Sequence, residues 1–147
     1  MTNLYKELKD KQQKKVNDFP MKFAFTKEQF KEGMIELGLT ENDTDKVFSI
    51  ANGGFIRRTD SKAFETLFSD IQTELKNEID RDTIGDGFIA DMFVYELNNH
   101  EYLYNGDLSD TLDALNLTRE DVAGNKALNN GLDLAITKLK EADGGWF

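Results

Sequence analysis

Apolar residues recur with helical spacing along much of the chain, and one segment shows this most clearly. When residues 83–107 are placed at about 100° intervals, Phe88, Met92 and Leu97 fall on one arc, while Asp91 lies on the opposite side. Glycines precede this helix-forming stretch and tyrosines follow it. The pattern predicts an amphipathic helix whose apolar face lies in the core, and we expect the rest of the chain to pack around it.

The same periodicity predicts further helices on both sides of this segment. Thr26 and Gln29 have the spacing of a capping box at the start of one helix, and Pro20, the only proline, ends another. In chain order, the additional predicted helices cover residues 3–19, 26–37, 61–80, 108–115, 118–122 and 126–140.

A strand is predicted where apolar and other residues alternate over residues 21–25. The alternation places Met21, Phe23 and Phe25 on one side, which we expect to be buried.

A hairpin is predicted a little further along the chain. Residues 47–50 and 55–58 flank Asn52-Gly53-Gly54, which is typical of a tight turn between strands, although the first arm equally suits the end of a helix. Because Arg57 and Arg58 follow the two glycines, the turn could also cradle a phosphate, but it lacks the lysine and the spacing of a P-loop.

These elements predict an α+β fold, a mostly helical single domain over residues 1–147 with a small antiparallel β-sheet. Residues 1–19 are expected to form a basic N-terminal helix, and residues 143–147 a flexible aromatic tail that ends in Trp146 and Phe147. At 147 residues and 39% hydrophobic, the chain is long enough for one core without disulfide or metal support.

Composition narrows the cellular setting. The chain contains no cysteine, which excludes disulfides, thiolate zinc sites and cysteine nucleophiles and is typical of intracellular proteins. It also shows no signal peptide and no apolar run of membrane-spanning length. We therefore expect a cytoplasmic protein of a bacterial host cell that does not bind membranes.

The charge of −10 is unevenly distributed. Residues 1–31 carry eight lysines against four acids, whereas residues 60–121 carry sixteen acids against four basic residues, a net charge of −12. Since affinity for phosphates comes mainly from clustered Lys and Arg, direct nucleic-acid binding is not expected. An acidic face can instead compete for a basic groove on a protein that handles nucleic acid, or can simply keep a small protein in solution.

Glu96 breaks the apolar arc of the central helix, and His100, the only histidine, follows one turn later. Because side chains four residues apart are neighbours on a helix, the two can meet. They form either a buried polar pair that satisfies itself or an acid/base pair.

A metal site is not expected, because a transition-metal site needs more ligands than one histidine and one carboxylate provide. Asp82, Asp86, Gly87 and Ile89 match positions one, five, six and eight of a calcium-binding EF-hand loop, but Ile84 stands at position three and Phe93 replaces the closing glutamate. A helix N-terminus capped by Asp86 explains this stretch better, although a carboxylate-only calcium or magnesium site stays open. No cofactor is expected.

Two runs of sequence resemble a family of small, acidic, uncharacterised proteins encoded by phages and mobile elements of gut bacteria. They are FPMKFAFTKEQFKEGMIELGL at residues 19–39 and GDGFIADMFVYELNNHEYLYNGDLSDTLDALNLT at residues 85–118. The resemblance implies no catalytic residue. It implies a setting in which such proteins are accessory factors, some of which inhibit CRISPR nucleases or other host defences.

The charge pattern and this resemblance lead to one functional hypothesis, a non-enzymatic binding protein of anti-CRISPR type. As a nucleic-acid mimic, it would occupy a basic nucleic-acid site on a partner protein, such as a CRISPR-associated nuclease. The residues expected to contact the partner are Asp80, Asp82, Asp86, Asp91, Asp107, Asp110 and Asp113, with Trp146 and Phe147 as a secondary contact.

Two other classes of function stay open. One is a small hydrolase that uses Glu96 and His100 with carboxylates of residues 80–91. The other is a structural or dimerising phage protein in which Trp146 and Phe147 matter most. The sequence does not fix the oligomeric state.

Overall fold

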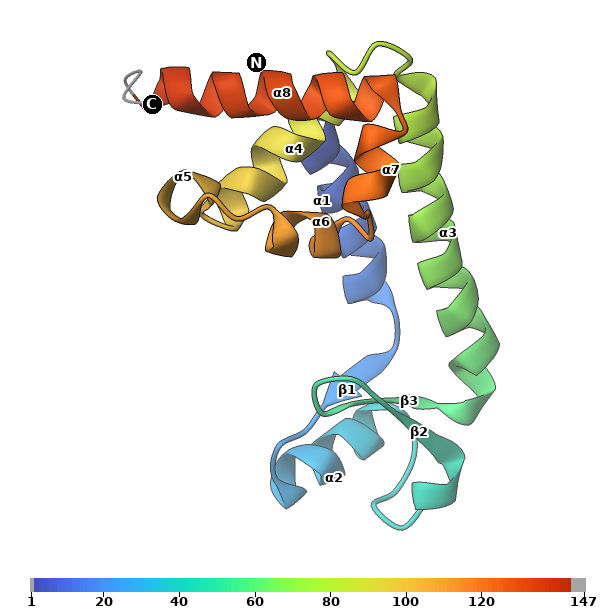
Figure 1. Ribbon diagram of the computed structural model, residues 1–147. Coiled ribbons are helices and arrows are strands. Elements are labelled where there is room, and N and C mark those ends of the chain that lie inside the picture. The colour runs from blue at the N-terminus through green and yellow to red at the C-terminus, as the bar shows by residue number, and fades with distance from the viewer. Residues whose placement is uncertain (1, 144–147) are drawn as a thin grey trace. The chain divides into compact units, whose positions relative to one another are not determined.

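The computed structural model describes residues 2–143 (Figure 1). In this part of the chain, a three-stranded antiparallel sheet accompanies a larger helical portion, which confirms the predicted α+β class. The elements in chain order are α1 (Leu4–Asp18), β1 (Met21–Phe23), α2 (Lys27–Glu36), β2 (Val47–Ile50), β3 (Gly54–Arg57), α3 (Ser61–Arg81), α4 (Phe88–Asn99), α5 (Tyr102–Asn105), α6 (Ser109–Ala114), α7 (Arg119–Ala123) and α8 (Lys126–Ala142), with 3₁₀ turns at Thr44–Lys46 and Arg58–Asp60.

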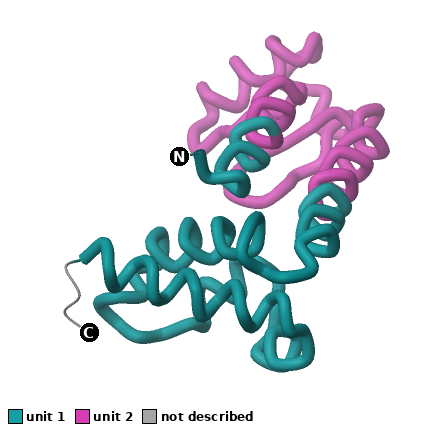
Figure 2. The backbone as a smooth tube through the Cα atoms, turned by 90° about the horizontal axis from the view of Figure 1, so that it is seen from above, with its two compact units in different colours: residues 1–11, 73–147 teal, residues 12–72 magenta. Residues whose placement is uncertain are grey.

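The chain divides into two compact units, drawn in different colours in Figure 2. Unit 1 consists of residues 1–11 and 73–147, and unit 2 of residues 12–72, so α1 and α3 each contribute to both. The prediction of a single domain over residues 1–147 stays a prediction.

Unit 1 is built around α4, as the sequence pattern predicted. Met92, Phe93 and Leu97 are completely buried, and they pack with residues of α6, α7 and α8 and with Tyr5 of α1. Burying such side chains contributes roughly 1.5–3 kcal/mol each. The amphipathic pattern of residues 83–107 therefore identified the central helix correctly.

Two glycines let the segment before α4 approach α8 closely. Gly85 has a φ of +91°, and a Cβ atom there would overlap the carbonyl oxygen of Ala127. On α8, a Cβ atom at Gly131 would overlap the Ile89 side chain. The start of α4 and the start of α8 are thus in backbone contact that only glycine permits.

Unit 2 has a smaller core between the sheet and α2. The strand order is β1-β3-β2, and Met34, Leu37 and Phe55 are buried between the sheet and the helix. The predicted hairpin of residues 47–50 and 55–58 is confirmed, with β3 one residue earlier than expected. Thr26 caps α2 as predicted, since its hydroxyl accepts a hydrogen bond from Gln29 N at 3.1 Å.

The prediction that Met21, Phe23 and Phe25 lie on a buried side is wrong. Met21 is half-buried, but Phe23 is 51% and Phe25 is 77% exposed. The alternation correctly places Phe23 and Lys22 on opposite faces, but α2 covers the Lys22 face: a Cβ atom on Gly33 would lie 3.1 Å from Lys22 Cβ. Strand β1 also ends at Phe23, so Phe25 lies beyond it.

Candidate functional site

The segment that leads into α4 is held by Asp82. Its carboxylate accepts hydrogen bonds from the backbone N–H groups of Gly85, Gly87 and Ile89 at 2.9, 3.1 and 3.0 Å. The prediction that Asp86 caps this helix is therefore wrong, because Gly87 is the N-cap residue and Asp82 supplies the carboxylate. Asp82 lies five residues before Gly87, and it reaches the N-terminus of α4 because the chain turns back at Gly85, which has a positive φ.

These hydrogen bonds change the acidity of Asp82. Partial burial alone would raise its pKa, but hydrogen bonds from the N–H groups of Ile89, Gly85 and Gly87 outweigh burial and lower the pKa below its ordinary value. Asp82 is therefore charged at neutral pH, at the end of α4 where a helix favours negative charge. Its role in the structure is to hold a loop.

Glu96 is the centre of a buried polar cluster that joins α1 to α4. Only 2% of Glu96 is exposed, and its Oε1 atom accepts hydrogen bonds from the Tyr5 hydroxyl at 3.0 Å and from Lys9 Nζ at 3.2 Å. His100 Nε2 lies 3.3 Å from the other carboxylate oxygen. The predicted meeting of Glu96 and His100 is confirmed, but two side chains of α1 complete the cluster.

The contact between His100 and Glu96 is an ion-pair distance without hydrogen-bond geometry. His100 Nε2 is buried and has no hydrogen bond within the described residues, so the 3.3 Å separation is a close approach and not an aligned bond. In contrast, Tyr5 is firmly held: burial, and then the charge of Glu96, raise the pKa of its hydroxyl well above the ordinary value.

Sequence reasoning missed Tyr5 and Lys9 as partners of Glu96. Tyr5 lies on the apolar stripe of α1 and packs against Phe88 and Tyr95, with ring centroids 5.9 and 5.5 Å away, so its spacing indicates only a core residue. The available signal was a carboxylate on an apolar arc, which requires a donor from another element. Nothing in the sequence pattern identifies that donor some 90 residues earlier.

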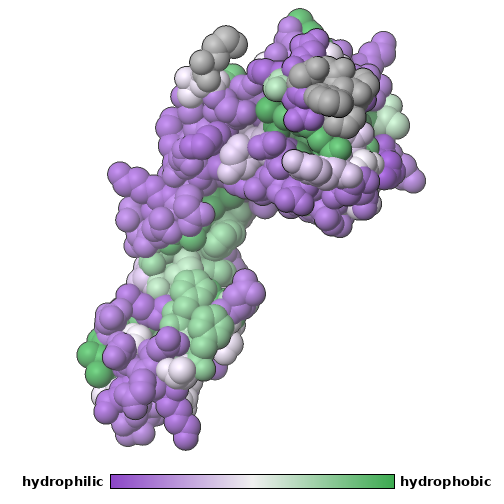
Figure 3. All heavy atoms as spheres, turned by 90° about the vertical axis from the view of Figure 1, so that its left-hand side faces the viewer, coloured by the Kyte–Doolittle hydropathy of each residue, from purple (hydrophilic) through white to green (hydrophobic). Residues whose placement is uncertain are grey.

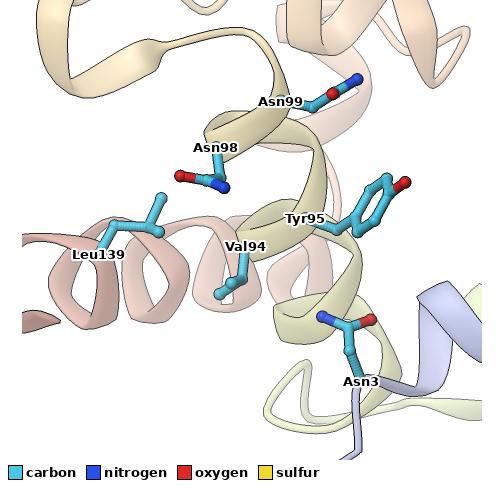
Figure 4. A pocket seen from close by; sticks show the side chains of 6 residues that line it. All are labelled: Asn3, Val94, Tyr95, Asn98, Asn99 and Leu139. Atoms are coloured by element: carbon cyan, nitrogen blue, oxygen red, sulfur yellow. The ribbon is translucent and has the colours of Figure 1, made fainter.

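A hollow of about 340 Å³ lies beside α4, on another part of its surface. Figure 4 shows that Val94 and Asn98 project toward Leu139 of α8, whereas Tyr95 and Asn99 project to the other side of α4. The polar groups therefore do not converge on a common point, as a binding or catalytic pocket requires. The residues that line it are Asn3, Val94, Tyr95, Asn98, Asn99 and Leu139.

The seven aspartates expected to contact a partner fall into three groups in the structure, which are half-buried, exposed but engaged, and exposed. Asp82 and Asp91 are half-buried, and both carboxylates accept backbone hydrogen bonds, Asp91 from Leu4 N at 2.9 Å. Asp107 is exposed but accepts a bond from Ser109 N, and Asp80 pairs with Lys76 at 3.0 Å. The remaining three, Asp86, Asp110 and Asp113, are exposed.

The acidic residues of α6 and α7 share one segment of unit 1. Residues 107–121 carry five acids and one arginine, and all five acids are exposed. Trp146 and Phe147, the expected secondary contact, lie outside the described residues, as does most of the predicted tail at 143–147.

The sequence analysis also left open a carboxylate metal site and a phosphate-binding turn at Gly53-Gly54. Residues 2–143 contain no group of three His, Asp or Glu side chains that could hold a metal ion. Both arginines after the Gly53-Gly54 turn are engaged: Arg57 pairs with Asp60 at 2.8 Å, and Arg58 Nε donates to the Asp45 carbonyl at 2.6 Å. The turn serves a hairpin.

Fold and charge together define an acidic, mostly helical α+β protein. The chain belongs to a family of unknown function, DUF7659, which matches residues 4–138. This agrees with the predicted resemblance to an uncharacterised family, while the phage or mobile-element origin stays a prediction. Comparisons with curated proteins and with solved structures gave no match. Within the described residues, no helix has the length and apolar character needed to cross a membrane.

Proposed function

We propose that this chain is a non-enzymatic binding protein whose acidic surface occupies a basic, nucleic-acid-binding site on a partner protein. In its finer form, the partner is a CRISPR-associated nuclease and the chain is an inhibitor carried by a phage or mobile element. That finer form is supported by the resemblance of residues 19–39 and 85–118 to proteins of such elements.

The observation that carries the proposal is the separation of charge between the two units. Unit 1 has eighteen acids against nine Lys and Arg, a net charge of −9, whereas unit 2 has ten acids against nine, a net charge of −1. An acidic unit produces a field that attracts a basic groove and repels nucleic acid. Charge of this kind gives orientation and fast association.

The contact residues within unit 1 are those predicted aspartates whose carboxylates are exposed. Asp86, Asp110 and Asp113 meet this condition fully, whereas Asp80 and Asp107 are exposed but engaged, Asp80 with Lys76 and Asp107 with Ser109 N. Asp82 and Asp91 contribute charge to the surface but hold backbone groups, so we assign them a structural role.

The Glu96 cluster is assigned to the architecture of unit 1 in this proposal. A carboxylate that is 2% exposed and bonded to Tyr5 and Lys9 is not placed to exchange protons with a substrate. Removing one side chain of the cluster would leave a buried polar group without a hydrogen bond, which costs free energy. The cluster therefore stabilises the packing of α1 on α4.

The test measures whether the protein displaces DNA from a guide-loaded CRISPR-associated nuclease, by fluorescence anisotropy of a labelled duplex. We expect displacement that weakens as salt is raised. Combining Asp86→Lys, Asp110→Lys and Asp113→Lys should weaken inhibition at least about tenfold, because three attractive charges become repulsive.

A matched variant separates a local surface from total charge. Glu32→Lys, Glu65→Lys and Asp70→Lys change exposed residues of unit 2 by the same total charge and should leave inhibition within about twofold at physiological salt. Equal losses in both variants, or inhibition that ignores salt, would contradict the acidic-surface mechanism. Binding to other basic nucleic-acid-handling proteins with the same aspartate dependence would remove only the nuclease assignment.

A further inference from the structure

One face of the sheet in unit 2 is apolar and lies opposite the face that α2 covers. Because residues paired directly across strands point to the same face, the register places Met21, Ile56 and Phe48 in one row and Phe23, Gly54 and Ile50 in the next. Figure 3 shows apolar side chains gathered in a band on the side of unit 2 that faces the viewer.

Phenylalanines dominate the exposed part of this face. Phe23 is 51%, Phe25 is 77% and Phe48 is 40% exposed, while Ile56 between them is 2% exposed. The rings of Phe23 and Phe25 lie over the hairpin turn, since Cβ atoms on Gly54 and Gly53 would lie 3.0 and 2.9 Å from them. We call Phe23, Phe25 and Phe48 the phenylalanine patch.

The size of the phenylalanine patch indicates what can cover it. With about 200 Å² for each aromatic side chain, the exposed fractions amount to about 350 Å², within the range of functional patches on monomers. A stable interface between two folded proteins takes about 800 Å² from each partner. The patch is therefore too small for a stable dimer of this chain and suits a short peptide segment.

The backbone beside the patch favours an extended segment. In the described residues, β1 pairs only with β3, so no strand lies on its other edge, although the N–H group of Met21 is already bonded to Phe19 O at 2.8 Å. A free edge presents unpaired N–H and C=O groups that an added strand can bind, with apolar side chains at alternate positions packing on the sheet.

The charge around β1 indicates an acidic segment. Residues 12–31, which contain β1 and the start of α2, carry five lysines against two acids. Lys22 of β1 is already paired with Glu36 at 2.6 Å, so the lysine that remains for a ligand beside the end of β1 is Lys27. Lys27 lines a hollow of about 370 Å³ together with Phe25 and Phe30, and Glu41 lies on the same hollow. A hollow of this kind beside the end of β1 can receive one apolar side chain whose neighbour pairs with Lys27.

We propose that unit 2 binds a short, extended, acidic protein segment along the free edge of β1, with apolar side chains packed on Phe23 and Phe25. This interaction is separate from the proposed role of the acidic surface of unit 1, and either can fail without the other. A single-stranded nucleic acid also stacks on aromatic side chains beside lysines, and the experiment below therefore includes one as a competing ligand.

The experiment titrates the isotopically labelled full chain with a ten-residue peptide of alternating Leu and Glu and follows its amide NMR signals. We expect saturable shifts at residues 21–25, 27 and 53–54. Phe23→Ser combined with Phe25→Ser should weaken binding at least about tenfold, and Lys27→Glu about threefold. Ile35→Ser is the matched control, since Ile35 is 59% exposed on α2 and outside the patch.

Four results of the binding experiments would overturn the proposal, and so would one result of a mass measurement. They are the absence of saturable shifts, equal affinity for a peptide of alternating Leu and Lys, equal loss of binding in the Ile35→Ser variant, and binding of a ten-nucleotide thymidine strand at the same residues. Unchanged signals from Met34 and Leu37, which belong to the core of unit 2, show that the double variant is folded where the peptide binds. A molecular mass that doubles with concentration and depends on Phe23 would assign the patch to a second copy instead.

Discussion

Units 1 and 2 differ in both core and surface. Among the described residues, the core cluster of unit 1 contains thirteen buried side chains, whereas that of unit 2 contains Met34, Leu37 and Phe55. Their surfaces differ as well. Unit 1 has a net charge of −9, whereas unit 2 has a net charge of −1 and exposes phenylalanines.

The comparison shows how one chain can offer two kinds of interaction. The large core of unit 1 keeps the backbone that carries the acidic residues of α6 and α7 from rearranging. Charge complementarity requires such fixed positions only loosely. The small core of unit 2 leaves apolar area uncovered, where binding energy comes from burial. Salt should therefore weaken the interactions of unit 1 strongly and those of unit 2 less, because the charge of Lys27 supplies only part of the binding there.

The largest expected effect comes from removing a core side chain from each unit. Phe93→Ala in unit 1 empties a completely buried site and should cost about 4 kcal/mol, and Met34→Ala in unit 2 should cost about 3 kcal/mol. Because unit 2 has the smaller core, we expect Met34→Ala to speed amide hydrogen exchange in residues 12–72 while α4 and α8 stay protected. Hydrogen exchange followed by mass spectrometry measures both.

This prediction also tests whether the two units are thermodynamically separate. If Met34→Ala accelerates exchange equally in α8 and in β3, the units unfold as one and the difference between their cores has no energetic meaning. Ile35→Ala supplies the control, because Ile35 neighbours Met34 in α2 but is exposed and should change exchange little.

The next effect concerns the backbone contact within unit 1. Gly85→Ala should destabilise the protein by about 3 kcal/mol, because it adds a Cβ atom against the Ala127 carbonyl at a positive φ. Gly106→Ala also places alanine at positive φ, +66°, but nothing lies within 4 Å of its Cβ position, so it should cost only about 1 kcal/mol. Urea unfolding followed by circular dichroism compares them, and equal losses would mean that strain alone determines the need for glycine.

Local sequence signals predicted most of the elements correctly. Helical periodicity identified α4 and α8, the Asn52-Gly53-Gly54 turn identified the hairpin, and Thr26 with Gln29 marked the start of α2. At the start of α2, the Gln29 side chain accepts a hydrogen bond from Phe25 N at 2.7 Å, whereas a capping box would use the N–H group of Thr26. These features succeed because each depends on residues close together in the chain.

The predictions that failed depended on contacts between distant segments. Alternation assigned Phe23 to a face of β1 but could not show that α2 covers the other face. Glu96 was correctly singled out as a carboxylate among apolar residues, yet its donors Tyr5 and Lys9 lie on α1. Asp82 displaced Asp86 as the cap because the loop turns back at Gly85.

The smallest expected effect is a loss of stability at alkaline pH that comes from Tyr5. All four tyrosines of the chain lie in unit 1, so we expect this loss in unit 1 and not in unit 2. Burial and the charge of Glu96 raise the pKa of Tyr5 in the folded protein, while an unfolded tyrosine ionises near pH 10. The contribution of the protonated Tyr5 hydroxyl to stability is therefore fully present below about pH 10. It is lost as the pH rises toward the pKa of Tyr5 in the folded protein, because the tyrosine of the unfolded chain releases its proton first.

Tyr5→Phe should accordingly lower stability by about 1 kcal/mol at pH 8, since Glu96 loses one hydrogen-bond donor, and should flatten the decline of stability above pH 10. Urea unfolding between pH 8 and 11 measures both effects. Tyr104→Phe is the control, because that side chain is 91% exposed and its replacement should leave the alkaline decline unchanged. If the stability of the Tyr5→Phe variant declined with the same slope above pH 10, the Glu96 cluster would not determine how the stability of unit 1 depends on pH. Other ionisable groups would then account for the difference between the two units at alkaline pH.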